Sequence, residues 1–163
     1  MNIGRAVRHL SSPAWIVRNT FTERALSDIE AAIAATERTH GGEIRFAVEG
    51  NRSAAELWRN VSARERALEV FARLGVWDTE ANNGVLIYVL WADHDVEIIA
   101  DRGFNGRVSS EEWTAVCHLM EQHFRANNAQ QAIIEGVRSV GSLVAKHFPA
   151  IDRNELPDRP VML

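Results

Sequence analysis

The sequence predicts a single α/β domain with a small mixed β-sheet that includes a β-hairpin, and three observations support this fold class. The length of 163 residues suits one domain. The run GVLIYVLW, residues 84–91, lacks polar alternation and is rich in strand-forming residues, which predicts a central strand buried on both faces. Only three residues separate it from the next strand, DVEIIAD, so the two must form an antiparallel hairpin, because a parallel crossover needs a longer connection.

The first half of the domain is predicted to be a helix followed by a strand. Thr22 is a suitable N-cap for a helix over residues 22–40, whose apolar stripe carries Leu26, Ile29 and Ile33. The strand EIRFAVEG, residues 43–50, alternates apolar and charged residues, which predicts that one face points to the core. Helical sequence connects it to the central strand, so we expect these two strands to be parallel and joined by a right-handed crossover.

The crossover itself is predicted to contain two helices. Ser53 can cap the first, and Ser62 with Glu65 forms a capping box for the second. The apolar spacing in the second helix predicts a buried face made of Leu68, Phe71 and Leu74.

Two more helices complete the predicted domain. Ser109 and Glu112 form a capping box before the first, and the second covers residues 129–148. Gly136 and Gly141 inside the second helix predict close packing against the sheet, since each glycine costs roughly 1 kcal/mol relative to alanine. The chain then divides into an N-terminal extension over residues 1–20, the α/β domain over 21–148 and an extended Pro-rich tail over 149–163.

Composition and charge argue against several classes of function. The net charge of -4 disfavours a nucleic-acid partner, which usually meets a basic surface. The single cysteine, Cys117, excludes an internal disulfide and a Cys-based zinc cage, and we interpret it as a small core residue. No apolar run reaches the roughly 18 residues that a membrane span requires, and the N-terminus lacks the apolar segment of a signal peptide.

These features predict a cytoplasmic protein. The first 24 residues nevertheless carry four arginines mixed with apolar residues and Trp15. A peripheral contact with the inner membrane, or with a membrane-associated or envelope protein, is therefore an open alternative to an ordinary N-terminal helix packed on the domain.

Acidic and amide residues gather at the ends of the predicted hairpin. Asp78, Glu80 and Asn82 occupy alternate positions in the loop before the central strand. In a hairpin, Asn82 and Asn83 should lie beside Asp101, whereas Asp93 belongs to the opposite edge, near residues 49–51. Carboxylate and amide oxygens are the ligands of Ca²⁺, so the pattern predicts a calcium site at one of two edges.

Other interpretations of these loops stay open. The loop before the central strand is not an EF-hand, and its Asn-Gly step is also typical of a helix-to-strand turn that needs a positive φ. Arg102 could hold a phosphate or pair with Asp101, and pairing is the default. The histidines form no ligand set, and no catalytic residue can be named from the sequence.

The segment RALEVFARLGVWDTEANNGVLIYVLWADHDVEIIADRG, residues 66–103, resembles the core of the TPM domain family. TERALSDIEAAIAATERTHGGEIRFAVE, residues 22–49, is similar to the opening helix and first strand of that family. The resemblance covers roughly residues 20–148, and the Asn83-Gly84 step is its most specific part.

The resemblance implies a Rossmann-like three-layer α/β/α sandwich, a calcium site in the loops and the weak acid-phosphatase character of plastid relatives. The family motif carries over Asn82, Asn83 and Asp93, while Asp78, Glu80 and Asp101 come from the hairpin geometry. The family often has Asp at position 82 and Gly at position 101. This chain has Asn82 and Asp101, so it has one negative charge fewer at the first position and one more at the second. Whether the chain is an enzyme stays open, and a non-enzymatic module that contacts proteins or a membrane surface is the alternative.

Overall fold

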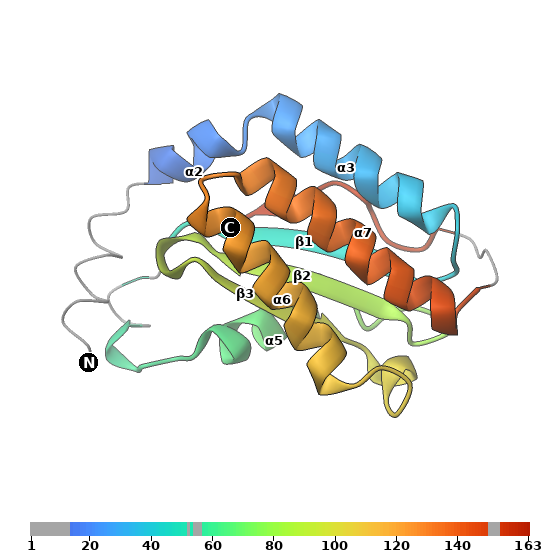
Figure 1. Ribbon diagram of the computed structural model, residues 1–163. Helices are drawn as coiled ribbons and strands as arrows, with labels where there is room; N and C mark the ends of the chain where they lie inside the picture. The colour runs from blue at the N-terminus through green and yellow to red at the C-terminus, as the bar shows by residue number, and fades with distance from the viewer. Residues whose placement is uncertain (1–13, 52, 54–56, 150–153) are drawn as a thin grey trace.

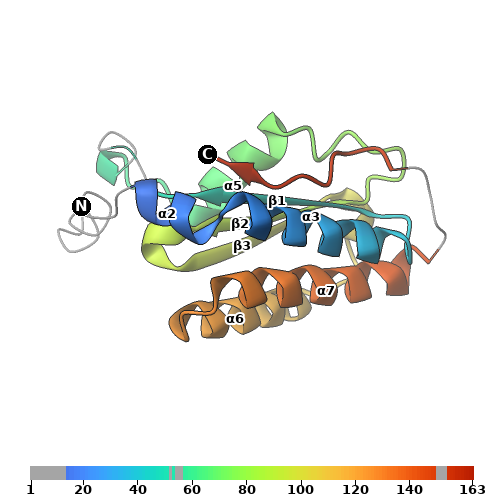
Figure 2. The ribbon, with the colours of Figure 1, turned by 90° about the horizontal axis from the view of Figure 1, so that it is seen from above.

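The computed structural model describes residues 14–51, 53, 57–149 and 154–163. A mixed four-stranded sheet lies between two helical layers (Figures 1 and 2). Its strands are β1 (Glu43–Glu49), β2 (Gly84–Leu90), β3 (Asp95–Ala100) and β4 (Val161–Met162), in the order β3-β2-β1-β4. The predicted α/β fold class is confirmed.

The strand directions agree with the predictions from the connections. β1 and β2 are parallel, with Glu43 opposite Gly84 and Glu49 opposite Leu90. α5 (Ala63–Arg73) lies in the crossover between them. β2 and β3 are antiparallel and are joined by the short 3₁₀ turn η1 (Trp91–Asp93).

The helices cover both faces of the sheet. α3 (Glu23–Glu37), α6 (Ser110–Arg125) and α7 (Ala129–His147) pack on one face, and α2 (Ala14–Thr20) precedes α3. α5 and the C-terminal segment, residues 154–163, lie on the opposite side from α6 and α7 (Figure 2). The strands therefore alternate their apolar side chains between two cores, and β2 is buried along its whole length.

The predicted helix caps at Thr22, Ser62 and Ser109 are present. Thr22 accepts a hydrogen bond from the backbone N–H of Ala25, and the capping box of Ser62 and Glu65 is complete. Ser109 and Glu112 form a second complete capping box at the start of α6. These caps satisfy N–H groups that have no partner within their helices.

α5 buries a different face from the one predicted. Its buried residues are Ala63, Ala67 and Val70, whereas Leu68 is 49% exposed and Phe71 is only half-buried. The small residues let α5 lie close to the sheet, and the larger ones pack around its margin. The expectation that Leu68, Phe71 and Leu74 form the buried face was therefore wrong.

The two glycines of α7 allow helices to pack together, not a helix to pack on the sheet. A Cβ atom on Gly136 would lie 2.3 Å from Sδ of Met120 in α6, and one on Gly141 would lie 2.8 Å from Cβ of Thr36 in α3. Close packing was predicted correctly, but the neighbour was not.

β1 is buried on both faces, although its sequence alternates. Glu43, Arg45 and Glu49 are all buried, because α5 and the C-terminal segment cover the face that was expected to meet solvent. Arg66 of α5 donates from Nε and Nη2 to the two carboxylate oxygens of Glu49, at 2.9 and 2.8 Å. Among the described residues, no helix combines the length and apolar character needed to cross a bilayer.

Candidate functional site

The candidate site lies where β1 and β2 begin and β3 ends, which we call the Asn83 end of the sheet. The turn that leads into β2 needs a left-handed residue, and Asn82 supplies it with φ of 53°. Gly84 is required for a different reason, because a Cβ there would lie 2.0 Å from the carbonyl oxygen of Val76. The Asn83-Gly84 step therefore belongs to the turn, but the residue with the positive φ is Asn82, which precedes this step.

The hairpin brings the end of β3 to this turn, as the sequence predicted. The N–H of Asp101 donates to the carbonyl of Gly84 at 2.9 Å, and the N–H of Gly103 donates to the carbonyl of Asn82 at 2.9 Å. A Cβ on Gly103 would lie 2.4 Å from that same Asn82 oxygen. Two loops separated in sequence thus lie against each other through main-chain contacts.

Two side-chain oxygens at this end are buried without a hydrogen-bond donor among the described residues. Asn83 is 1% exposed, and its Nδ2 donates to the carbonyl of Gly41, but its Oδ1 has no partner. Asp101 accepts from the N–H of Arg102 through Oδ1 at 2.7 Å, while its Oδ2 has no partner. Buried oxygens are normally satisfied, so each of these two needs an explanation.

Arg102 contacts a different side chain from the one predicted. Its Nε donates to Oδ1 of Asn82 at 2.6 Å, and its contact with Asp101 is made by the backbone N–H. η2 (Arg102–Phe104) follows directly, with Asp101 as its N-cap. The Arg102 guanidinium therefore donates a hydrogen bond to Asn82 Oδ1, an oxygen that was predicted to face a cation.

Asp78 and Glu80 lie in the loop that precedes Asn83 in the chain, and both are exposed. The N–H of Asp78 donates to the carbonyl of Gly75, which forms a turn. The N–H of Glu80 donates to both carboxylate oxygens of Glu155, at 3.2 and 3.1 Å. This loop is therefore tied to the C-terminal segment by its backbone.

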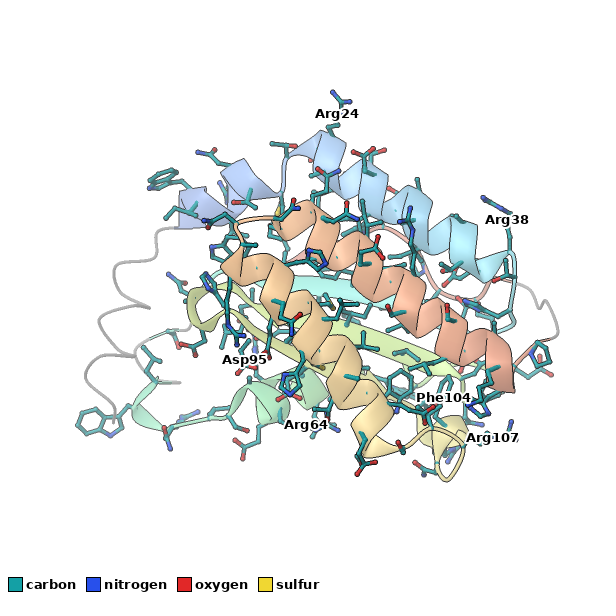
Figure 3. All side chains as sticks on the ribbon, viewed as in Figure 1. Arg24, Arg38, Arg64, Asp95, Phe104 and Arg107 are labelled. Carbon is teal, nitrogen blue, oxygen red and sulfur yellow. The ribbon has the colours of Figure 1, made fainter. Side chains whose placement is uncertain are left out.

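Asp93 lies at the opposite end of the sheet, in η1. The N–H of Ala92 donates to the carbonyl of Gly50, which places this turn beside the end of β1. Figure 3 shows the same separation, with Asp95 at one end of β3 and Phe104 beyond the other. The six predicted ligands are divided between two ends, and in the described part of the chain no three His, Cys, Asp or Glu residues form a metal-ligand group.

Comparison with known proteins identifies the family. The TPM domain matches residues 17–143. The chain belongs to the TPM domain family. Among solved structures, the NMR structure of the BA42 protein from the psychrophilic bacterium Bizionia argentinensis is similar, with 30% sequence identity and a TM-score of 0.76 over 87% of this chain and 94% of that chain.

A second solved structure supports the fold alone. The N-terminal domain of a protein from P. gingivalis, determined by NMR, has a TM-score of 0.64 at 17% identity and covers 82% of each chain. No curated protein sequence matches this chain.

Asp101 of this TPM domain borders a surface cavity of ≈ 300 Å³. Arg64, Ser110 and Trp113 line the same cavity, so it lies between the start of α5, the edge strand β3 and the start of α6. Figure 3 labels Arg64 and Phe104, two residues that line this cavity near the β3 edge of the sheet.

The structure also has a second cavity, which was not predicted from the sequence. It measures ≈ 290 Å³ and is lined by Glu37, His40, Glu43 and Asp158 among others. Burial raises the pKa of Glu37 to about 8, the N–H of Ile44 opposes the shift, and the carboxylates of Glu43 and Asp158 add to it. No signal in the sequence indicated this cavity, because the strand that contains Glu43 was predicted to expose its charged face and the position of Asp158 could not be foreseen.

Proposed function

We propose that this TPM-domain protein is a divalent-cation-binding module, with calcium as its ion, and that the ion is held at the Asn83 end of the sheet. One observation carries the proposal: Asn83 Oδ1 and Asp101 Oδ2 are both buried without a donor among the described residues, at neighbouring strand ends. An unsatisfied buried oxygen costs about 1–3 kcal/mol, and a hard cation that accepts oxygen ligands removes that cost.

Other oxygens at this end support the same chemistry. Asn82 Oδ1 becomes a ligand if Arg102 moves from it, and Asp78 and Glu80 are exposed in the adjoining loop. Calcium takes six to eight oxygens and accepts carbonyls and water beside carboxylates, so a site with few carboxylates suits calcium better than a more demanding ion. Asp93 belongs to the other end and would serve only a separate ion.

Phosphatase activity is proposed to be weak or absent. A phosphomonoesterase needs positive charge or a metal against the phosphoryl oxygens. Arg102 is the nearest guanidinium to Asp101 along the chain, and its Nε is already bonded to Asn82. We expect only slow hydrolysis of a generic phosphate ester, and any activity that persists in Asp101→Asn arises elsewhere.

Thermal melts and calorimetry with CaCl₂ and MgCl₂ test the proposal. At 100 times Kd, binding stabilises the fold by about 2.7 kcal/mol. For a chain of this size, that corresponds to a rise in Tm of roughly 5–10 °C. Asp101→Asn should reduce the shift strongly, because it removes the buried charge while keeping the shape of the side chain.

Two further variants locate the site. Asp28→Asn in α3 makes the same chemical change at an exposed position, and it should leave the calcium-dependent shift unaltered. Asp93→Asn reports on the opposite end of the sheet. No response of the native protein to millimolar calcium would refute the proposal, and a shift lost only in Asp93→Asn would move the ion to the other end.

A second candidate function, a non-enzymatic module that contacts a membrane surface or an envelope protein, rests on exposed tryptophans. Trp15 is 60% exposed and Trp58 is 76% exposed, and large exposed aromatic side chains are typical of contact surfaces. The arginines and apolar residues before position 14 lie outside the described residues. Co-sedimentation with anionic liposomes should weaken in Trp15→Ala and Trp58→Ala, and unchanged binding would discard a membrane contact through these tryptophans.

A further inference from the structure

The C-terminal segment, residues 154–163, forms the outer edge of the sheet. β4 pairs with β1 in parallel, with Val161 opposite Ala47 and Met162 opposite Val48. The N–H of Leu163 donates to the carbonyl of Val48 at 2.9 Å. Figures 1 and 2 show this segment running along β1, so its docking completes one side of the molecule.

Charged groups on β1 and α3 hold the rest of the segment. The carboxylate of Glu43 accepts from the N–H groups of Glu155 and Leu156, at 3.1 and 3.0 Å. Arg159 reaches α3 from the segment, with Nη2 at 2.8 Å from Glu23 and Nη1 at 3.5 Å from Glu30. The segment is thus bound by these polar contacts together with the apolar packing of Leu156 and Val161.

Two carboxyl groups lie at one cavity between α3 and the C-terminal segment. Glu37 and Asp158 both line it, and the negative charge of Asp158 adds to the rise in the pKa of Glu37 that burial causes. Glu37 accepts from the N–H of Ile44 through Oε1 at 2.7 Å, while Oε2 is buried without a donor among the described residues. A proton on Glu37 keeps this carboxyl group neutral, and its loss leaves two negative charges at the same cavity.

Arg45 attracts the carboxylates of Glu37 and Asp158, but burial is the largest influence on Glu37 and raises its pKa. The groups around it are Glu43 and Arg45 of β1, Asp158 of the C-terminal segment, and Arg38 and His40 beside Glu37 itself. Arg45 is buried and its Nη1 donates to the carbonyl of Arg159 at 3.4 Å, whereas Arg38 extends outward from the end of α3 (Figure 3). Burial lowers the pKa of His40, so its ring is neutral when Glu37 ionises.

We propose that the C-terminal segment is a pH-gated latch, closed while Glu37 holds a proton at the cavity that it shares with Asp158 and loosened when that proton leaves. The latch involves no cation and goes beyond the proposed function. When the segment is released, Glu37 becomes more exposed and loses the neighbouring Asp158 carboxylate, and both changes remove support for its neutral form. The latched form therefore binds the proton more tightly than the released form.

The sign and size of the effect follow from linkage. Glu37 has a pKa of about 8 with the segment docked, against 4.5 for an unperturbed group. Relative to the released form, the latched form is stabilised most below pH 4.5, and it loses this stabilisation as pH rises from 4.5 to about 8. In that window the ratio of latched to released protein falls by up to about tenfold for each pH unit, and it is constant above the upper value.

Hydrogen exchange of the full chain in the presence of a chelator tests the latch. The amides of Leu156 and Leu163 report on the segment, and the amide of Ile87 in β2 reports on global unfolding. After correction for intrinsic exchange rates, the protection of Leu156 and Leu163 should fall by roughly tenfold or more from pH 6 to pH 8. In Glu37→Gln, whose side chain is neutral at every pH, this fall should disappear.

Glu30→Gln is the matched control, because it makes the same change on α3 and weakens a contact with Arg159. It should lower protection by a constant factor at both pH values and keep the fall seen in the native protein. Constant protection in the native protein, or an equal fall in Glu37→Gln, would overturn the proposal. Exchange of Leu156 and Leu163 at the rate of Ile87 would also overturn it, since the segment would then open only on global unfolding.

Discussion

Replacing Glu37 by glutamine should change how the global stability of the protein depends on pH. Glu37 is largely buried, and its pKa in the folded state is raised from 4.5 to about 8. Between these values the folded protein keeps a proton that the unfolded chain has lost. The free energy of unfolding therefore falls as pH rises through this window, and the contribution is fully lost above pH 8.

The magnitude follows from the size of the shift. One pKa unit corresponds to about 1.36 kcal/mol, so the three units between pH 5 and pH 8 amount to at most about 4 kcal/mol. Glu37 keeps some contact with solvent, which screens its charge, and we expect roughly 2 kcal/mol. The side chain introduced by Glu37→Gln retains an oxygen for the N–H of Ile44 and has no proton to lose, so this loss should be absent.

Urea denaturation at pH 5, 6, 7 and 8 measures the effect. Other groups also titrate, and the informative quantity is the difference between the native protein and Glu37→Gln at each pH. That difference should grow with pH in favour of the variant. Equal pH dependence of the two proteins would show that Glu37 ionises normally in the folded state, and the reasoning from its burial would be wrong.

Three other predictions concern packing, capping and reactivity. Val70→Ala should destabilise the fold by about 2 kcal/mol because Val70 is fully buried, whereas Leu68→Ala on the same helix should cost less than half as much, as chemical denaturation can show. Ser109→Ala removes one half of the capping box of α6 and should lower the free energy of unfolding by about 1 kcal/mol. Hydrogen exchange should show a larger loss of protection at the start of α6 than in the rest of the protein. Burial raises the pKa of Cys117 to about 12, so its reaction with a disulfide reagent at pH 8 should be on the order of a hundred- to a thousandfold slower in the folded protein than in urea; equal rates would contradict this.

Predictions that depend on local sequence agree with the structure. The cap at Thr22 and the capping boxes at Ser62 and Ser109 are short-range patterns, and all three are present. The hairpin was predictable because three residues cannot form a crossover, and it placed Asn82 beside Gly103. The family resemblance was also available from contiguous segments, and it is confirmed over residues 17–143.

Predictions that depend on distant contacts agree less well. The spacing of Leu68 in α5 suited a buried stripe, but the helix approaches the sheet through Ala67 and Val70 because small side chains allow a shorter distance. The alternation in β1 suggested one exposed face, yet Arg45 is buried because the C-terminal segment lies over it. Neither outcome can be read from periodicity, since periodicity describes one element and not its neighbours.

The sequence by itself determined the α/β class, the strand directions and the grouping of Asn82, Asn83 and Asp101 at one end of the sheet. Each of these follows from connection lengths and local residue preferences. Only the tertiary structure decided that Asn83 and Asp101 keep oxygens without donors among the described residues, and that Glu37 and Asp158 line one cavity. Burial and the loss of water create those properties, and they exist only after distant segments have packed together.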